Sequence, residues 1–128
     1  MAREFQEEKM NVGEGWWPIV DEMHKDLTRL LGEYELQQIK EKFGGLRYYM
    51  QVGSGCNPAL MGQVRDIITA GEDKSTETCE TCGQEGTNQS IGGWYKTLCP
   101  GHAEARKIAV ARRMSDRDRP PQPFDPFF

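Results

Sequence analysis

Cys79-Glu-Thr-Cys82-Gly83 and Cys99-Pro-Gly-His102 are the two stretches that decide how this chain folds. They read C-x2-C and C-x2-H, and sixteen residues separate the two pairs. Two close ligand pairs joined by a loop of this length are typical of a structural zinc site, in which three thiolates and one neutral imidazole complete a tetrahedral shell. The sequence therefore predicts a zinc ion held by Cys79, Cys82, Cys99 and His102.

A shell closed by four protein ligands leaves no position for a reacting water, so the predicted site is structural rather than catalytic. Nucleobase deaminases also contain a C-x-x-C pair, but they need an H-x-E motif, and His24 has no glutamate two residues after it. Cys56 stands alone ahead of a predicted helix, and we interpret it as a small loop residue. We therefore expect a protein that is not an enzyme.

The segments around the ligands predict a ββα module. Residues 88–98 predict a short hairpin that turns at Gly92-Gly93, where both glycines tolerate positive φ. A helix is expected from Cys99 to about residue 115, because AEARKIAVARRM at 103–114 is rich in strong helix formers. A C-x2-C knuckle, a hairpin and two ligands at a helix N-terminus together indicate a treble-clef-like arrangement rather than a zinc ribbon.

Residues 16–71 predict a helix, a β-hairpin and a second helix. Apolar residues recur at three- and four-residue spacing over residues 16–32, and Gly32 marks a stop. Residues 34–52 alternate between apolar and polar side chains, as a half-buried hairpin does. The second helix is expected at residues 57–70, with Asn57 as its N-cap and Gly71 closing it.

The hairpin at 34–52 is expected to turn at Gly44-Gly45, which pairs Phe43 with Leu46 and Glu41 with Tyr48. One face of this hairpin then carries the apolar side chains Ile39, Phe43, Leu46, Tyr48, Met50 and Val52. Glu41 alone falls on that face, and it is either a buried carboxylate with a basic partner or an exposed edge residue.

The fold class expected from these patterns is α+β, a helix–β-hairpin–helix followed by the zinc module. The expected parts are a flexible arm at 1–15, an α/β-hairpin/α sub-domain at 16–71, the zinc-binding module at 72–118 and a Pro/aromatic tail at 119–128. Residues 72–78, EDKSTET, are expected to be a polar connector between the two halves. The halves are expected to share one core through Trp16, Trp17 and Trp94.

The composition is that of a soluble protein, with 37% hydrophobic residues, 28% charged residues and no apolar run approaching the ~20 residues that span a bilayer. The polar N-terminus MAREFQEEKMNVGEG is not a signal peptide, so we expect a cytoplasmic location, the bacterial host cytosol if a phage encodes the chain. The net charge of −4 argues against broad capture of nucleic acid. Residues 96–119 are nevertheless basic, with seven Lys and Arg against three acidic groups, and they keep a local nucleic-acid contact open.

Three sets of residues are candidates for binding a partner. They are the polar hairpin face Lys40, Lys42, Arg47 and Tyr49, the basic helix residues Arg106, Lys107, Arg112 and Arg113, and the tail aromatics Phe124, Phe127 and Phe128. The hairpin face suits phosphate and base contacts and equally suits a solvated surface. The basic helix residues also complement the helix dipole. For the tail aromatics the sequence leaves open docking on their own domain, docking on a second copy, binding to a partner, or disorder. The Asp-Pro-Phe ending is similar to the partner-binding tip of bacterial single-stranded-DNA-binding proteins.

IKEKFGGLRYY (39–49) and TCETCG…TLCPGH (78–102) resemble a group of small proteins encoded by bacteriophages and bacteria. That group pairs a KEKFGGLR-type segment with a downstream two-plus-two zinc site, and the resemblance covers roughly residues 16–102. It implies an origin and a zinc site but no reaction. His102 stands where the group has a fourth cysteine, a change that zinc accepts.

These observations lead to one leading hypothesis and one alternative. The leading hypothesis is a zinc-stabilised phage or bacterial protein, not an enzyme, that binds and modulates a host protein. The alternative is a nucleic-acid-binding regulator that uses the basic C-terminal helix and the hairpin face. The sequence does not indicate an oligomeric state.

Overall fold

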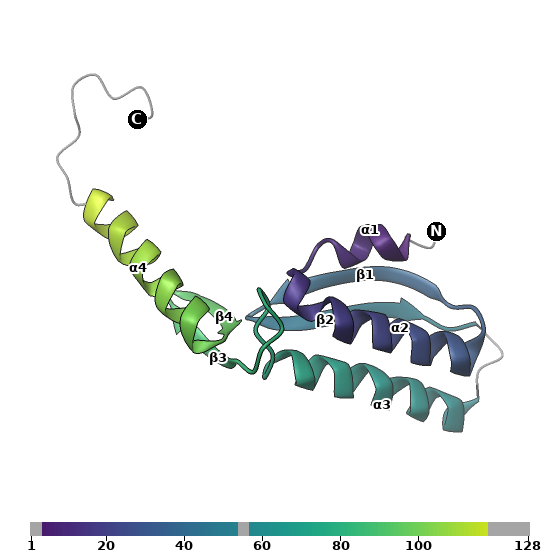
Figure 1. Ribbon diagram of the computed structural model, residues 1–128. Helices are drawn as coiled ribbons and strands as arrows, with labels where there is room; N and C mark the ends of the chain where they lie inside the picture. Colours follow the sequence, from purple (N-terminus) through teal and green to yellow (C-terminus); the bar gives the residue numbers. More distant parts are fainter. Residues whose placement is uncertain (1–3, 54–56, 118–128) are drawn as a thin grey trace, which may run out of the picture.

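The computed structural model describes residues 4–53 and 57–117, and Figure 1 shows the order of their elements. The fold is mixed α+β, with two separate two-stranded antiparallel sheets and several helices. The elements are α1 (Phe5–Lys9), the 3-10 turn η1 (Glu14–Trp16), α2 (Trp17–Leu31), β1 (Glu35–Lys42), β2 (Gly45–Gln51), α3 (Pro58–Ser75), β3 (Thr87–Ile91), β4 (Trp94–Leu98) and α4 (Pro100–Arg117). Cys56 and the tail aromatics Phe124, Phe127 and Phe128 lie outside the described residues.

Helix α2 confirms the helix expected at residues 16–32. Pro18 occupies its first turn, where the missing N–H is tolerated, and Gly32 ends it with a φ of 75°. Its buried side chains Ile19, Val20, Met23 and Leu27 follow the helical period and pack in the larger core.

Helix α3 begins as expected and ends later than expected. Asn57 caps it, because its side chain accepts a hydrogen bond from the Leu60 N–H at 2.8 Å. The expected stop at Gly71 is wrong, since the helix continues to Ser75 and shortens the connector expected at 72–78. A Cβ at Gly71 would lie 2.2 Å from Met23 Sδ, so this glycine lets α2 and α3 approach closely rather than ending a helix.

The hairpin β1–β2 exists as expected, but its register differs. Glu41 pairs with Leu46 and Ile39 pairs with Tyr48, so the turn centres on Phe43 and Gly44 rather than on Gly44-Gly45. These two residues have φ values of 54° and 76°, as in type I′ turns. The side-chain oxygen of Glu41 accepts the Gly44 N–H at 2.8 Å and closes the turn.

The two-residue slip of β1 leaves the assignment of most side chains to faces intact, because the side-chain period of a strand is two. Ile39, Leu46 and Tyr48 are buried as expected. Phe43, which was expected on the apolar face, is instead 66% exposed at the tip of the turn. That expectation is wrong because the residue left the strand when the register moved.

Residues 5–15, expected within a flexible arm, pack on the rest of the protein. The Glu8 carboxylate accepts the Ile39 N–H at 3.2 Å, and the Asn11 amide donates to the Ile39 carbonyl at 3.3 Å. These side chains satisfy the free edge of β1 as a neighbouring strand would. Phe5 stacks on His24 with ring centroids 3.9 Å apart, which fixes α1 against α2.

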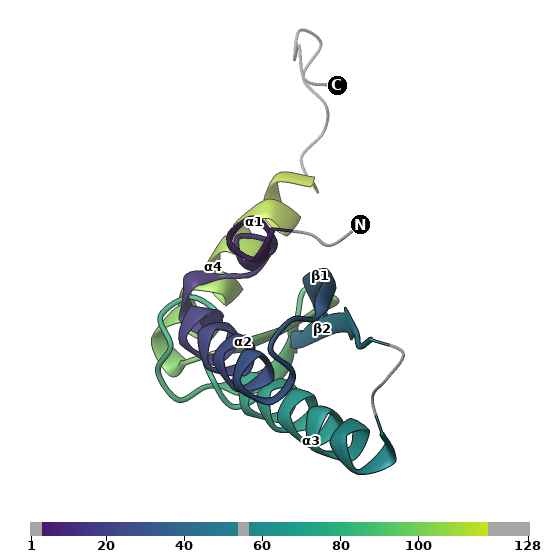
Figure 2. The same cartoon turned by 90° about the vertical axis from the view of Figure 1, so that its right-hand side faces the viewer.

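The other edge of the hairpin is sealed by α3. The Tyr48 N–H donates to Glu72 at 3.0 Å, and the Leu46 N–H donates to the Ser75 hydroxyl at 2.9 Å. Figure 2 shows α2 and α3 running beside each other on one side of β1 and β2. The extra turn of α3 beyond Gly71 therefore places Glu72 and Ser75 where they accept hydrogen bonds from the backbone of β2.

The described residues form two hydrophobic clusters instead of one core spanning both halves. The larger is built on α2, β1, β2 and α3, and the smaller contains Cys79, Ile91, Leu98 and Ala103. Trp16 is fully buried in the larger cluster, whereas Trp94 is 68% exposed, so the expected contribution of Trp94 to a shared core is wrong.

Hydrogen bonds join the two halves. The Trp16 indole donates to the Thr78 carbonyl at 2.9 Å, and the Thr97 hydroxyl donates to the Gly44 carbonyl at 2.6 Å. Figure 1 shows α4 projecting away from the half that contains β1 and β2. Within the described ranges, no helix has the length and apolar character needed to cross a membrane.

Candidate metal centre

Two tight local structures present the four candidate ligands. Cys79 and Cys82 flank a turn in which the Gly83 N–H donates to the Cys79 carbonyl at 2.9 Å. Gly83 has a φ of 82°, a conformation that glycine adopts without strain. Cys99 stands immediately before α4 and His102 lies in its first turn, where the Ala103 N–H donates to the Cys99 carbonyl at 2.8 Å.

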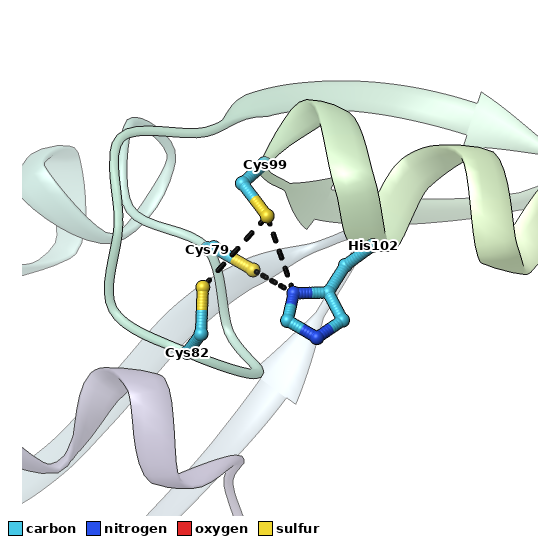
Figure 3. Close-up of side chains that lie close together, drawn as sticks. All are labelled: Cys79, Cys82, Cys99 and His102. Atoms are coloured by element: carbon cyan, nitrogen blue, oxygen red, sulfur yellow. Dashed lines mark hydrogen bonds between the residues drawn. The ribbon is translucent and has the colours of Figure 1, made fainter.

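The four ligand atoms converge on one point, as Figure 3 shows. They all lie within 4.8 Å of one another. The Cys82 and Cys99 sulfurs are 3.7 Å apart, and His102 Nδ1 lies 3.6 Å from the Cys79 sulfur and 3.2 Å from the Cys99 sulfur. Zinc bonds of about 2.3 Å to sulfur and about 2.0 Å to nitrogen place tetrahedral ligand atoms roughly 3.5–3.8 Å apart. The residues therefore fit a tetrahedral metal ion, and Nδ1 is the His102 nitrogen that faces the sulfurs.

The backbone around the site favours thiolates at two of the three cysteines. Burial opposes ionisation of Cys79, but backbone N–H groups of Cys99, Cys82 and Thr81 outweigh it and lower the pKa of its thiol to about 6. The His102 N–H, at the start of α4, lowers the pKa of the Cys99 thiol. Because the thiolate is the form that binds metal, the lowered pKa values of Cys79 and Cys99 favour binding of a cation.

Cys82 behaves differently. The Gln84 N–H favours its thiolate, but desolvation and the neighbouring Cys79 and Cys99 sulfurs outweigh that effect and raise the pKa of Cys82. Three thiolates this close repel one another unless a positive charge lies between them. The arrangement is thus suited to a cation at its centre, and the four side chains can hold a metal ion.

The N-terminal loop supports the knuckle, a contact that sequence reasoning missed. The Gly15 N–H donates to the Glu80 carbonyl at 3.0 Å. A Cβ at Gly13 would lie 2.1 Å from the Glu80 oxygen, and one at Gly15 would lie 2.1 Å from the Cys79 oxygen. The one sequence signal for this contact is the pair Gly13 and Gly15, because glycines allow the N-terminal loop to approach the backbone at Cys79 and Glu80 closely.

The basic residues of α4 differ in their exposure to solvent and do not form one continuous basic surface. Lys107, Arg112 and Arg113 are exposed, whereas Arg106 is half-buried beside His102. Its Nε atom is buried and has no hydrogen-bond partner among the described residues. Arg106 therefore belongs to the surroundings of the metal centre rather than to an open basic surface.

The polar hairpin residues do share one face. Lys40 pairs across the sheet with Arg47, and its ammonium lies 5.5 Å from the centre of the Tyr49 ring. Sequence reasoning did not include Phe43 or Tyr95 in this set. Their rings meet edge to face at 6.2 Å, because the tip of β1–β2 docks on β4.

Comparisons with protein-family models, with curated proteins and with solved structures gave no match.

Proposed function

We propose that Cys79, Cys82, Cys99 and His102 bind one zinc ion and that residues 79–117 form a treble-clef-like module. The convergence of three sulfurs and one imidazole nitrogen within 4.8 Å supports this assignment. Thiolate-rich tetrahedral sets favour zinc over magnesium or calcium, which prefer oxygen ligands. Zinc supplies a cross-link between the knuckle and the start of α4, and the smaller hydrophobic cluster alone is too small to hold them.

Metal analysis of the purified chain tests the zinc assignment. We expect one zinc per chain, and cobalt substitution is expected to give the absorption of a tetrahedral thiolate site. His102→Cys keeps four soft ligands and should retain the metal, whereas His102→Ala should lose it. A chain without stoichiometric metal after growth with zinc, or equal retention by both variants, would contradict the assignment.

The zinc module is a scaffold in this proposal, and the chain is a phage or bacterial protein, not an enzyme, that binds and modulates a host protein. The observation that carries the protein-binding function is an apolar groove of about 340 Å³ between α2 and α3. Its lining consists of Ile19, Met23, Ile67, Ala70 and Gly71 with Glu22, Asp26, Asp66 and Lys74 around them.

The chemistry of this groove selects the kind of partner. An apolar floor between two helices fits the apolar face of an amphipathic helix. Asp26 pairs with Arg29 at 3.0 Å. Glu22 and Asp66 make no ion pair with any described residue, and in this proposal they pair with lysine or arginine side chains of the partner. We therefore infer that the groove binds a basic amphipathic helix of the host protein. The resemblance around IKEKFGGLRYY supports the phage or bacterial origin.

Site-specific cross-linking tests the groove. A photo-reactive residue at Ala70, which lines the groove, is expected to capture a partner through a basic helix. The matched control is Thr69, an exposed neighbour on α3 that does not line the groove.

The captured partner is then purified and its affinity for two charge variants is measured. Ala70→Arg should weaken binding at least tenfold by repelling a basic helix, and Thr69→Arg should leave binding within about twofold. Equal cross-linking from both positions, or tight binding by Ala70→Arg, would overturn the groove assignment.

A further inference from the structure

One face of the β1–β2 hairpin is turned away from the core. Its side chains are Glu35, Gln38, Lys40, Lys42, Arg47, Tyr49 and Gln51, and Glu35 is the only acidic one among the described residues of this face. This composition stands out in a chain whose net charge is −4. Glu35 stands opposite Gln51 at the far end of the hairpin from the turn. The three cations make no ion pair with any carboxylate in the described part of the chain.

Two exposed aromatic rings continue this face beyond the turn. Phe43 is 66% exposed and Tyr95 is 48% exposed, and their rings lie 6.2 Å apart at an angle of 84°. The Lys42 ammonium lies 5.6 Å from the centre of the Phe43 ring. The three cations therefore lie between the Tyr49 ring at one end of the face and the Phe43 and Tyr95 rings at the other.

The hairpin β3–β4 fixes the β1–β2 turn at Phe43 and Gly44 through two hydrogen bonds. The Asn88 amide donates to the Phe43 carbonyl at 3.1 Å, and the Thr97 hydroxyl donates to the Gly44 carbonyl at 2.6 Å. Phe43 has a φ of 54°, a conformation that is unfavourable for a residue with a large side chain. Phe43 therefore combines a strained backbone conformation with a ring that is exposed to solvent.

We propose that this basic–aromatic face, made of Lys40, Lys42, Phe43, Arg47, Tyr49 and Tyr95, binds single-stranded nucleic acid. The cations neutralise backbone phosphates, and the rings of Phe43, Tyr49 and Tyr95 offer surfaces on which unpaired bases stack. A duplex has no free bases for those rings, and an acidic peptide uses the cations but not the stacking surfaces. This function goes beyond protein binding in the α2–α3 groove and uses a different surface.

Binding of a fluorescent oligothymidylate of about 12 nucleotides to the full, zinc-loaded chain tests the charge component. Each phosphate contact with a single strand contributes about −0.7 to the slope of log affinity against log salt, so three cations predict about −2. Replacing Lys40, Lys42 and Arg47 by Gln should remove most of this slope.

The matched control removes the same charge from α4 by replacing Lys107, Arg112 and Arg113 by Gln, all of which are exposed. That control should keep its affinity within about threefold and keep its slope. Equal weakening of the two triple variants would overturn the proposal, because binding would then follow net charge alone. No binding by the native chain at low salt would also overturn it.

A second pair of variants tests stacking. Phe43→Asn removes the ring, and asparagine tolerates positive φ, so the turn is retained. We expect a loss of about tenfold in affinity with an unchanged salt slope. Trp94→Gln is the control, because Trp94 is 68% exposed and the next residue to Tyr95 on β4, so its side chain lies on the other face of that hairpin. An equal loss in both variants would contradict the proposed face.

Competition distinguishes the kind of anionic partner. Unlabelled single strands should displace the labelled oligonucleotide, while duplex DNA and polyglutamate of equal charge should compete at least tenfold less well. Polyglutamate that competes as well as single strands would overturn the proposal in favour of an acidic protein partner. Ala70→Arg in the α2–α3 groove should not weaken oligonucleotide binding, so the two binding proposals fail independently.

Discussion

Gly44 occupies a position in which a side chain has no room. A Cβ there would lie 2.5 Å from Asn88 Nδ2 and 3.0 Å from backbone atoms of Tyr95 and Lys96, and the residue has a φ of 76°. We expect Gly44→Ala to lower the free energy of unfolding by about 2–4 kcal/mol, because steric contact adds to backbone strain. Urea unfolding of the zinc-loaded chain measures the change.

Gly93 provides the control for Gly44. It has a similar φ of 85°, but a Cβ there meets no atom within 4 Å. Gly93→Ala should therefore lower the free energy of unfolding by only about 1–2 kcal/mol, the part due to conformation. Equal losses in the free energy of unfolding for Gly44→Ala and Gly93→Ala would show that Gly44 is not in close steric contact with β4.

His24 gives the protein a pH dependence of its own. Its Nδ1 lies 2.5 Å from the Tyr34 hydroxyl, which in turn hydrogen-bonds the Tyr48 hydroxyl. Burial lowers the pKa of His24, although Asp21 opposes the shift. Protons therefore bind the unfolded chain more readily, so this contribution is present above the unfolded pKa of about 6.5 and is lost as the pH falls below it.

His24→Gln tests this linkage. We expect the free energy of unfolding to fall less between about pH 7.5 and about pH 5.5 in the variant than in the native chain. His102 and the thiols respond to acid in both proteins, so the difference between the two proteins isolates His24. Parallel pH profiles would contradict the assignment.

At the scale of elements, the edges of β1–β2 are sealed by side chains rather than by further strands. Glu8→Ala leaves the Ile39 N–H without its acceptor and should lower the free energy of unfolding by about 1–3 kcal/mol. Glu7→Ala, at an exposed neighbour on α1, should change it by no more than about 0.5 kcal/mol. Chemical denaturation measures both. Unchanged hydrogen exchange at the Ile39 amide in Glu8→Ala would refute this role.

At the scale of the whole molecule, the two hydrophobic clusters differ in size and in their need for metal. Among the residues placed by the structure, the buried members of the smaller cluster are Cys79, Ile91, Leu98 and Ala103. We expect chelation of the metal to accelerate hydrogen exchange strongly over residues 79–113 and much less in α2, β1, β2 and α3. Exchange mass spectrometry with and without chelator measures this. Uniform acceleration along the chain, or continued protection of residues 79–113, would contradict two separate clusters.

Local sequence patterns predicted the types of most elements and the composition of the candidate site. The spacing of Cys79, Cys82, Cys99 and His102 predicted their convergence, because both pairs are set by short turns that need no distant contact. The apolar period predicted α2, and the glycine pairs predicted two hairpins. The docked segment at 5–15 was not predictable in this way, since a helix of five residues has little stability without its contacts to β1.

The sequence by itself determined the ligand set, the types of most helices and strands and most of the two faces of the first hairpin, because each depends on residues close together in the chain. Only the tertiary structure decided the register of β1 against β2, since a slip of two residues preserves the face of each residue that stays in a strand, and local patterning does not detect it. Contacts of Gly44 with β4 accompany the observed register. In this register Phe43 lies in the turn rather than on the apolar face of the hairpin. Its ring therefore lies beside Tyr95 and forms part of the basic–aromatic face.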